Sequence, residues 1–394
     1  MKSEEKFSKT MSNPEYRKIL KNKLNSLNST ILSEPDGTLI VIVAFLVTIG
    51  IMAIFSATAQ KAMDEGANPA AYILKQLFCL GIGVFVMKFF INFDYKKLAH
   101  HSIWIAWGVV ILLALVDYTT LGITVNGAKR WMMLGPLQFQ PSELAKISLI
   151  LLLANAFYKD AELFVSRKFK YYIPILAMIF LIYKQPNLSM ILLLLITGLI
   201  MYLSSGGPLK MILGAGVVGS AILCVFIKPY QLNRIKIWFN PEADPLGQGY
   251  NVIQSKLAFA AGGLWGVGYG NSKQKLAWLP EGHTDFIFAV VGEEAGFLGC
   301  LLIICLFYGL VHRGLIISSR CPDIFGKLVA VGITIMIGVQ AALNMSVASS
   351  FLPATGVPLP FISYGGTSLI VNMAMMGILL NISRKRIRRI NNIE

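Results

Sequence analysis

Long apolar runs separated by polar segments fill the chain between residues 38 and 382. A helix needs about 20 apolar residues to cross the ~30 Å hydrocarbon core of a bilayer, and most of these runs approach that length. The pattern predicts an all-α polytopic membrane protein with about ten transmembrane helices. The predicted spans lie near residues 38–57, 74–91, 102–116, 141–158, 171–184, 188–203, 208–227, 284–311, 325–347 and 366–382.

The polar segments between these spans differ in length. With an even number of spans, three informative segments face the side opposite to the chain ends, over residues 117–140, 228–283 and 348–365. The longest lies between the seventh and eighth spans, and it is too rich in Gly, Trp and Leu to be disordered. Within it, residues 251–269 alternate apolar or small residues with polar ones, too weakly for a span. We predict an interfacial or re-entrant helix there.

Composition and charge support this topology. The 394 residues are 55% hydrophobic and 14% charged, whereas soluble domains carry about 25% charged residues. Much of the net charge of +15 lies in basic tails over residues 1–37 and 383–394. Basic residues that flank spans mark the cytoplasmic side. The charge therefore predicts two cytoplasmic tails around one transmembrane domain, residues 38–382, and it does not indicate nucleic-acid binding.

Asp285 lies where the longest outer segment enters the eighth span, in the sequence Trp278-Leu-Pro-Glu-Gly-His-Thr-Asp-Phe-Ile-Phe288. A structural interpretation makes Thr284 or Asp285 the N-cap of the following helix. A catalytic interpretation makes the carboxylate a general base, because a carboxylate in a partly dry groove can take a proton from a sugar hydroxyl. The two roles are compatible, and a proline and His283 would fix the approach to the helix.

Further acidic residues lie inside predicted spans. Glu293 and Glu294 are roughly 12 Å deeper than the start of the eighth span, at about 1.5 Å per helical residue. Carboxylates at this depth must pair or line a cavity, and Lys146 and Arg130 are candidate partners. In the fourth span, Glu143 and Lys146 are spaced i, i+3 and can pair on one helix face. A buried ion pair or a hydrogen-bond anchor is the alternative to a catalytic role for Glu293 and Glu294, and a self-neutralising pair at the helix start is the alternative for Glu143 and Lys146.

Basic residues are also concentrated in the predicted outer segments, against the usual charge bias. They are Lys129, Arg130, Lys228, Arg234, Lys236, Lys256, Lys273 and Lys275. A solvated loop face explains several of them. A cluster beside a membrane-embedded acid is also what an anionic headgroup such as a diphosphate needs, and Arg130 and Arg234 are the candidates for that contact.

Two segments are rich in glycine or proline. Gly262-Gly-Leu-Trp-Gly-Val-Gly-Tyr-Gly270 has no strand before it, so we reject dinucleotide binding and expect tight turns with close backbone approach. The run from Pro353 to Thr367 contains three prolines and three glycines, which predicts a rigid non-helical path that is buried or lines water. The five cysteines lack metal-site spacing, and we expect small buried apolar side chains.

The chain resembles the SEDS family (shape, elongation, division and sporulation) over about residues 40 to 385. The motifs that carry the resemblance include Asn126-Gly-Ala-Lys-Arg-Trp, Gln140-Pro-Ser-Glu-Leu-Ala-Lys, Gly270-Asn-Ser-Lys-Gln-Lys, Leu279-Pro-Glu-Gly-His-Thr-Asp and the Pro353–Thr367 run. The chain is more similar to the division and sporulation members than to the elongation members. It departs from the family pattern Gln-Pro-Asp-Leu-Gly at Gln185-Pro-Asn187-Leu-Ser189, so a role that needs negative charge at Asn187 is absent or relocated.

The resemblance implies ten transmembrane helices and a peptidoglycan glycosyltransferase with an outer active site. The implied reaction polymerises lipid II, with undecaprenyl diphosphate as the leaving group. Asp285 would be the catalytic base. The candidate substrate-binding residues are Arg130, Lys146, Arg234, Lys129, His283, Gln254, Lys275 and Ser363, and the candidate structural acids are Glu143, Glu293 and Glu294. A lipid II flippase, an elongation polymerase and a non-enzymatic scaffold are the alternatives.

The resemblance also implies the surroundings of the reaction. No cofactor is required, although Asp285 and substrate phosphates could hold Mg²⁺ or Mn²⁺. The implied partners are a class B penicillin-binding protein, which is a transpeptidase, and divisome membrane proteins. The expected location is the cell membrane at the division septum.

Overall fold

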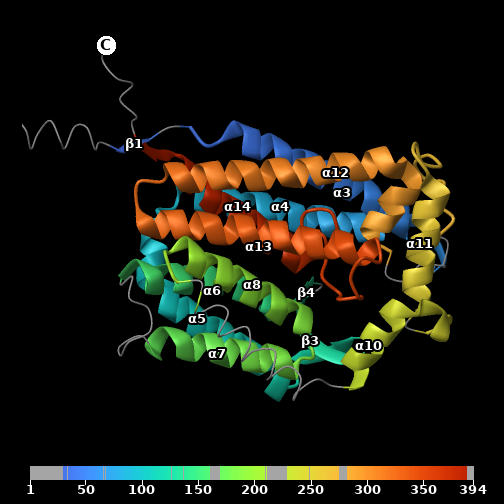
Figure 1. Ribbon diagram of the computed structural model, residues 1–394, viewed down its shortest axis with the longest axis horizontal. Helices are drawn as coiled ribbons and strands as arrows, with labels where there is room; N and C mark the ends of the chain where they lie inside the picture. The colour runs from blue at the N-terminus through green and yellow to red at the C-terminus, as the bar shows by residue number, and fades with distance from the viewer. Residues whose placement is uncertain are drawn as a thin grey trace, which may run out of the picture.

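The protein forms a bundle of long helices that run along one common direction (Figure 1). The computed structural model describes residues 30–32, 34–64, 66, 68–125, 127–135, 137–159, 169–208, 210, 229–247, 249–274 and 282–387. The helices are α3 (Gly37–Asp64), α4 (Ala71–Asn92), α5 (Tyr95–Tyr118), α6 (Pro141–Lys159), α7 (Phe169–Lys184), α8 (Leu188–Ser204), α10 (Pro229–Phe239), η1 (Pro241–Ala243), α11 (Tyr250–Gly262), α12 (Ile287–Arg320), α13 (Ile324–Ala348) and α14 (Gly366–Ser383).

The predicted spans correspond closely to these helices. The largest differences are at the C-terminal ends of α3 and α12, which continue beyond the predicted residues 57 and 311, and at the start of α5, which begins before the predicted residue 102. The span predicted at 208–227 lies almost entirely outside the described residues. Within the described part of the chain, six helices (α3, α4, α5, α12, α13 and α14) are long and apolar enough to cross a membrane. The polytopic helical class is therefore confirmed, whereas the exact number of spans remains a prediction.

Short polar side chains start several of the helices. Asp94 accepts a hydrogen bond from Lys96 N–H at the start of α5, at 3.3 Å. Asp323 accepts one from Gly326 N–H at the start of α13, at 2.8 Å. Such caps satisfy backbone N–H groups that have no partner within the first turn. They fix where α5 and α13 begin after their polar connections.

The centre of the bundle is formed by α13 and α14. The most apolar windows of these helices are 67% and 83% buried, against 17% for α4. In Figure 1, α13 runs between α12 and α8, while α11 crosses the end of the bundle. Side chains on α13 can therefore contact segments from several parts of the chain.

The two described ends of the chain lie at the same end of the bundle (Figure 1). Strand β1 (Thr30–Leu32) pairs antiparallel with β5 (Lys385–Ile387). Close to this pair, Arg313 Nη2 lies 2.9 Å from the buried carboxylate of Asp36, and Asp36 N–H donates to Ser383 Oγ at 3.0 Å. Ends on one side are what an even number of spans requires.

A small antiparallel sheet occupies the predicted segment 117–140, which the all-α prediction did not include. Strands β2 (Gly122–Val125), β3 (Ala128–Leu134) and β4 (Leu137–Phe139) pair in that order. Gly127 and Gly135 have φ values of 74° and 61° between the strands, a conformation that favours glycine. The central strand carries Lys129 and Arg130.

A break at Gly296 divides α12 into two parts. Gly296 has φ 66° and ψ −163°, which lies outside any helical conformation. The segment 263–268 packs into this break, and Val267 N–H donates to the carbonyl of Glu293 at 2.9 Å. The close backbone approach predicted for the glycine-rich segment is therefore confirmed.

Replacing Gly266 with alanine should destabilise the protein far more than replacing Gly270. Their φ values are 80° and 82°, but a Cβ atom at Gly266 would overlap the carbonyl of Glu294, whereas nothing lies within 4 Å at Gly270. The left-handed conformation costs alanine about 1–2 kcal/mol at either site. Overpacking adds about 1–3 kcal/mol at Gly266 only. Thermal unfolding in detergent measures this difference, and equal melting temperatures for the two variants would contradict the packing at the break.

Candidate active site

Asp285 lies in the turn that precedes α12. The N-cap of α12 is Phe286, without a side-chain cap hydrogen bond, so the N-cap interpretation of Thr284 and Asp285 is wrong. The Asp285 side chain is partly buried. Its Oδ2 atom lies 3.4 Å from the position that a Cβ atom would take on Gly356. The carboxyl group therefore lies against the loop that precedes α14.

This loop, residues 353–365, is hydrogen-bonded to the turn before α12. Ser363 Oγ donates to the carbonyl of Thr284 at 2.6 Å, and Tyr364 N–H donates to the carbonyl of His283 at 3.0 Å. Ser363, a predicted substrate-binding residue, is buried and joins two segments of the site. Residues 353–359 are outside any helix or strand, which confirms the predicted non-helical path.

His283 belongs to an aromatic cluster beside Asp285. Its ring centroid lies 6.0 Å from that of Tyr72 and 5.9 Å from that of Tyr364. Lys61 Nζ lies over the Tyr72 ring, 5.8 Å from its centroid. Burial raises the pKa of the Tyr364 phenol, which therefore stays neutral at physiological pH. These contacts fix the imidazole next to the turn that carries the candidate base.

Two buried amides on α13 anchor the turn and the loop from the core side. Asn344 Nδ2 donates to the carbonyl of Asp285 at 2.8 Å and to that of Val357 at 2.7 Å. One turn earlier, Gln340 Nε2 donates to the carbonyl of Pro358 at 2.9 Å. Because both amides sit on a buried helix, they fix the backbone of Asp285 relative to the loop that its carboxyl group touches.

Gln340 also contacts the ion pair predicted in α6. Lys146 Nζ lies 2.6 Å from Glu143 Oε2 and donates to Gln340 Oε1 at 2.9 Å. The side chains of Lys146 and Glu143 are 0% and 2% exposed. The predicted i, i+3 pair is confirmed. Lys146 reaches the site through Gln340 and has no exposed surface for a substrate.

The two cations of β3 contact carbonyl groups near helix ends. Arg130 donates through Nε to the carbonyl of Gln185 at 2.8 Å and through Nη2 to that of Pro186 at 2.6 Å. Lys129 Nζ donates to the carbonyl of Thr119, directly after α5, at 2.8 Å. Both cations hold the ends of α5 and α7 in this structure, and a diphosphate contact remains a prediction for each.

Asn187 and Ser189, which depart from the family pattern, have local roles. Asn187 Oδ1 accepts a hydrogen bond from Met190 N–H at 3.3 Å and caps α8. An amide oxygen serves this purpose as well as a carboxylate. Ser189 Oγ donates to the carbonyl of Thr355, which connects α8 to the loop that faces Asp285.

Arg234 is an exposed cation that contacts the same loop as Asp285. It lies on α10, and its Nη1 donates to the carbonyl of Ala354 at 3.0 Å. Gln254, another predicted substrate-binding residue, is partly buried on α11. Lys275 lies outside the described residues. Among the described outer cations, Arg234 contacts the loop beside Asp285, whereas Arg130 and Lys129 contact carbonyl groups near helix ends.

The Glu293 side chain is an anchor for the residues that directly follow the glycine-rich segment. Its buried carboxylate accepts hydrogen bonds from the Ser272 hydroxyl and from Lys273 N–H, the latter at 2.9 Å. For Glu293, the prediction that Lys146 or Arg130 is the partner is wrong. Both cations bind elsewhere, and the backbone N–H groups of a neighbouring loop satisfy the acid instead.

Glu294 has a similar structural setting. It is buried and accepts a hydrogen bond from the Ser56 hydroxyl of α3. Nearby, Tyr269 donates its hydroxyl to the carbonyl of Met52 at 3.0 Å. Burial, followed by the charge of Glu294, raises the pKa of Tyr269. The phenol therefore remains a donor, and the acid pair of α12 holds the glycine-rich segment against α3.

The profile of the FtsW/RodA/SpoVE family of cell cycle proteins matches residues 37–388. The chain belongs to this family. It is 38% identical over 357 residues to a probable peptidoglycan glycosyltransferase FtsW of Trichlorobacter lovleyi, covering 89% of this chain and 94% of that protein. It is 36% identical over 364 residues to stage V sporulation protein E of Bacillus subtilis, covering 89% of this chain and 98% of that one.

Solved structures of family members have the same fold. A chain from the structure of a peptidoglycan synthase complex, solved to show the structural coordination of polymerization and crosslinking, is 32% identical to this chain. Its TM-score is 0.73, and the match covers 89% of this chain and 98% of that chain. The rod shape determining protein RodA of Thermus thermophilus is 28% identical, with a TM-score of 0.66 over 90% of this chain and 98% of that one.

Three buried amides of this FtsW/RodA/SpoVE family member are not among the site residues predicted from the sequence. They are Gln340, Asn344 and Gln76, whose Oε1 accepts a hydrogen bond from Gly365 N–H at 3.3 Å. Each is an isolated amide within an apolar run. A polar side chain inside a span is costly unless it is paired. An isolated amide in an apolar run is therefore a sequence signal for a residue that anchors a polar segment.

Proposed function

We propose that this family member is a peptidoglycan glycosyltransferase that polymerises lipid II at the outer face of the cell membrane. The names of its FtsW relatives and of the synthase complex support the substrate class. The observation that carries the proposal is the placement of Asp285. Its carboxyl group lies against Gly356 while Asn344 holds its backbone, and the exposed Arg234 contacts the same loop at Ala354.

In the proposed reaction, Asp285 takes the proton of the C4 hydroxyl of the GlcNAc of lipid II. The hydroxyl oxygen then attacks C1 of the sugar at the end of the donor glycan. A new glycosidic bond forms, and the bond between C1 and the diphosphate oxygen breaks. Undecaprenyl diphosphate leaves with the electron pair, and Arg234 stabilises its charge. The proton on Asp285 passes to the leaving diphosphate or to water.

The other predicted cations have two kinds of role in this proposal. Lys146 positions Gln340, whereas Arg130 and Lys129, which hold helix ends, remain candidate contacts of the diphosphate. We also propose that His283, in the turn before α12, contacts the substrate. Gln254 and Lys275, which lie between α10 and α12 in the sequence, are the other proposed contacts. Ser363 contributes by joining the loop to that turn.

A divalent cation would depend on the substrate for most of its ligands. Among the described residues, no group of three His, Cys, Asp or Glu side chains could hold a metal ion. Asp285 is the candidate protein ligand, and diphosphate oxygens would complete the coordination of Mg²⁺ or Mn²⁺. The leaving group is already activated as a diphosphate, so the reaction needs no nucleotide.

We place both tails in the cytoplasm and Asp285 outside, at the division septum. The basic tails support this orientation, and the FtsW and sporulation relatives support a role in division. A penicillin-binding protein of class B is the proposed partner, with other divisome membrane proteins. The synthase complex, which couples polymerization to crosslinking, supports a transpeptidase partner.

Replacing Asn344 with leucine should lower the kcat of polymerisation by about 10-fold to 100-fold with little change in KM, because small displacements of a reacting group can cost about 10²-fold. The variant removes the bonds to the carbonyls of Asp285 and Val357. The control is Asn372→Leu. Asn372 is equally buried, but it donates to Ser368 on its own helix at 3.3 Å. Steady-state kinetics would contradict the positioning role if both variants lost activity equally.

The proposed function is tested by incubating the purified protein, alone and with its transpeptidase partner, with lipid II. Glycan chains should appear on gel electrophoresis, together with undecaprenyl diphosphate in proportion to the new bonds. The flippase alternative predicts movement of lipid II across vesicle membranes without chain formation. Translocation without glycan chains would overturn the glycosyltransferase proposal.

A further inference from the structure

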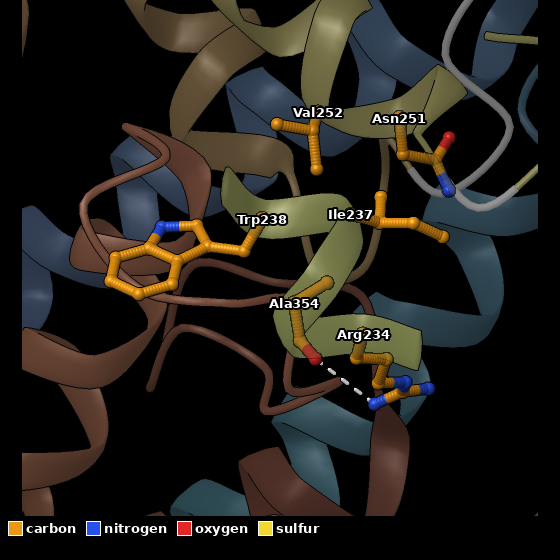
Figure 2. Close-up of a pocket in the computed structure, with 6 residues that line it drawn as sticks. All are labelled: Arg234, Ile237, Trp238, Asn251, Val252 and Ala354. Atoms are coloured by element: carbon orange, nitrogen blue, oxygen red, sulfur yellow. Dashed lines mark hydrogen bonds between the residues drawn. The ribbon is translucent and has the colours of Figure 1, made fainter. Parts of the chain in front are cut away.

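A cavity of about 190 Å³ lies between α10, α11 and the loop of residues 353–365 (Figure 2). It is lined by Arg234, Ile237, Trp238, Asn251, Val252 and Ala354. Arg234, Ile237 and Trp238 belong to α10. Figure 2 shows Arg234 bonded to Ala354 at the edge of the cavity. Gly356, which contacts the Asp285 carboxyl group, is two residues beyond Ala354.

The polar groups of the cavity include a buried acceptor without a partner and a cationic donor. The Oδ1 atom of Asn251 is buried and accepts no hydrogen bond from the described part of the chain. A buried acceptor without a partner is unfavourable, so an N–H group of a ligand would be stabilised there. Arg234 uses Nη1 for the Ala354 carbonyl, and its Nε and Nη2 groups are further donors. They can serve a ligand carbonyl or phosphate oxygen.

The rest of the lining is apolar and fixed in place. Ile237 and Val252 are each 5% exposed, and Ala354 adds a methyl group. Trp238 Nε1 donates to the carbonyl of Ser350 at 3.0 Å, which holds the indole ring at the edge of the cavity. A ligand group that enters here needs an apolar end as well as polar atoms.

We propose that this cavity binds the 2-acetamido group of an N-acetylated amino sugar. The acetamido N–H would bond to Asn251, its carbonyl would accept from Arg234, and its methyl group would pack on Ile237 and Val252. A free phosphate or carboxylate fits this lining less well, because it offers Asn251 Oδ1 another acceptor and leaves the apolar wall without a contact.

This inference rests on the proposed function and assigns a specificity role within it. In an N-acetylamino sugar diphosphate, the acetamido group is on C2 and the diphosphate on the adjacent C1. Arg234 at the edge of the cavity could therefore contact both groups of one sugar. Asn251 would be the residue that distinguishes an acetylated sugar from a free amine.

The test compares lipid II with an analogue that carries a free amine at C2 of the sugar next to the diphosphate. The wild-type enzyme should prefer the acetylated substrate in kcat/KM. Asn251→Leu should lose this preference, and its KM for lipid II should rise by about 3-fold to 10-fold, which is the effect of one neutral hydrogen bond. Asn251→Asp should favour the free amine, because a carboxylate pairs with an ammonium group. Lys236→Ala, an exposed change on α10 outside the lining, should behave as wild type.

Binding without turnover separates this inference from the proposed function. In saturation-transfer NMR, the methyl group of N-acetylglucosamine 1-phosphate should receive magnetisation from the wild type and much less from Asn251→Leu. A methyl signal without glycan synthesis would support the cavity and count against the polymerase. The cavity assignment would be overturned by a different result. In that result, Asn251→Leu and Asn251→Asp synthesise glycan chains, keep the wild-type preference for the acetylated substrate, and give the wild-type methyl signal.

Discussion

Replacing Asp285 with asparagine should lower the kcat of lipid II polymerisation by at least about 100-fold, because a positioned general base contributes roughly 10²–10⁴-fold. An amide of the same size fits beside Gly356, and the bond from Asn344 to the backbone carbonyl of residue 285 is unaffected. The variant should therefore fold normally and bind lipid II with little change in KM. Glycan chain formation over time measures the loss of rate.

The control for this variant is Asp64→Asn. Asp64 is an exposed carboxylate at the C-terminal end of α3, where it accepts a hydrogen bond from Gln60 Nε2 at 3.0 Å. Its hydrogen bond stays within α3, so its substitution should leave the rate unchanged. If Asp285→Asn polymerised lipid II at the wild-type rate, the proton would have to go to another group, and the contact with Gly356 would be only structural.

The features that could be predicted from the sequence are set by neighbouring residues. A run of apolar residues decides by itself whether a helix can cross a bilayer, so the spans agree with α3 to α8 and α12 to α14. Glu143 and Lys146 pair because an i, i+3 spacing places them on one helix face. The glycines of residues 262–270 allow close backbone approach wherever that approach occurs.

The features that could not be predicted depend on contacts between distant parts of the chain. Asn344 and Asp285 are 59 residues apart, and Ser363 and Thr284 are 79 residues apart. A carboxylate such as Glu293 must be paired, but its sequence position does not tell whether a cation or a set of backbone N–H groups will pair with it. The same ambiguity applied to Arg130, whose guanidinium group binds the carbonyls that end α7.

The short sheet of residues 122–139 illustrates a different limit. Strands of three to seven residues carry little periodic signal, and β-propensity depends on context more than helix propensity does. Gly127 and Gly135 mark the turns, but only the pairing of β3 with both neighbours makes these segments strands. The sheet matters for the site because it directs Arg130 toward the turn between α7 and α8.

Replacing Lys146 with methionine should be the most destabilising single change discussed for this protein. Methionine has a similar volume, but it leaves Glu143 charged, with a side chain that is 2% exposed and without a cation. Removing one partner of a buried ion pair costs about 3–5 kcal/mol. The change also removes the donor to Gln340 Oε1, whose Nε2 holds the Pro358 carbonyl. The loss should appear as a lower melting temperature in thermal unfolding of the detergent-purified protein.

The double variant Glu143→Gln with Lys146→Met separates the charge from the contact. Without either charge, most of the lost stability should return, because a buried ion pair and a neutral pair of similar volume often differ little in stability. Polymerase activity should return only in part, because Gln340 still lacks the Lys146 donor and the Pro358 end of the loop is less well held. A double variant as unstable as Lys146→Met would show that the cost does not come from the uncompensated carboxylate. A stable and fully active one would show that the ion pair does not position the loop beside Asp285.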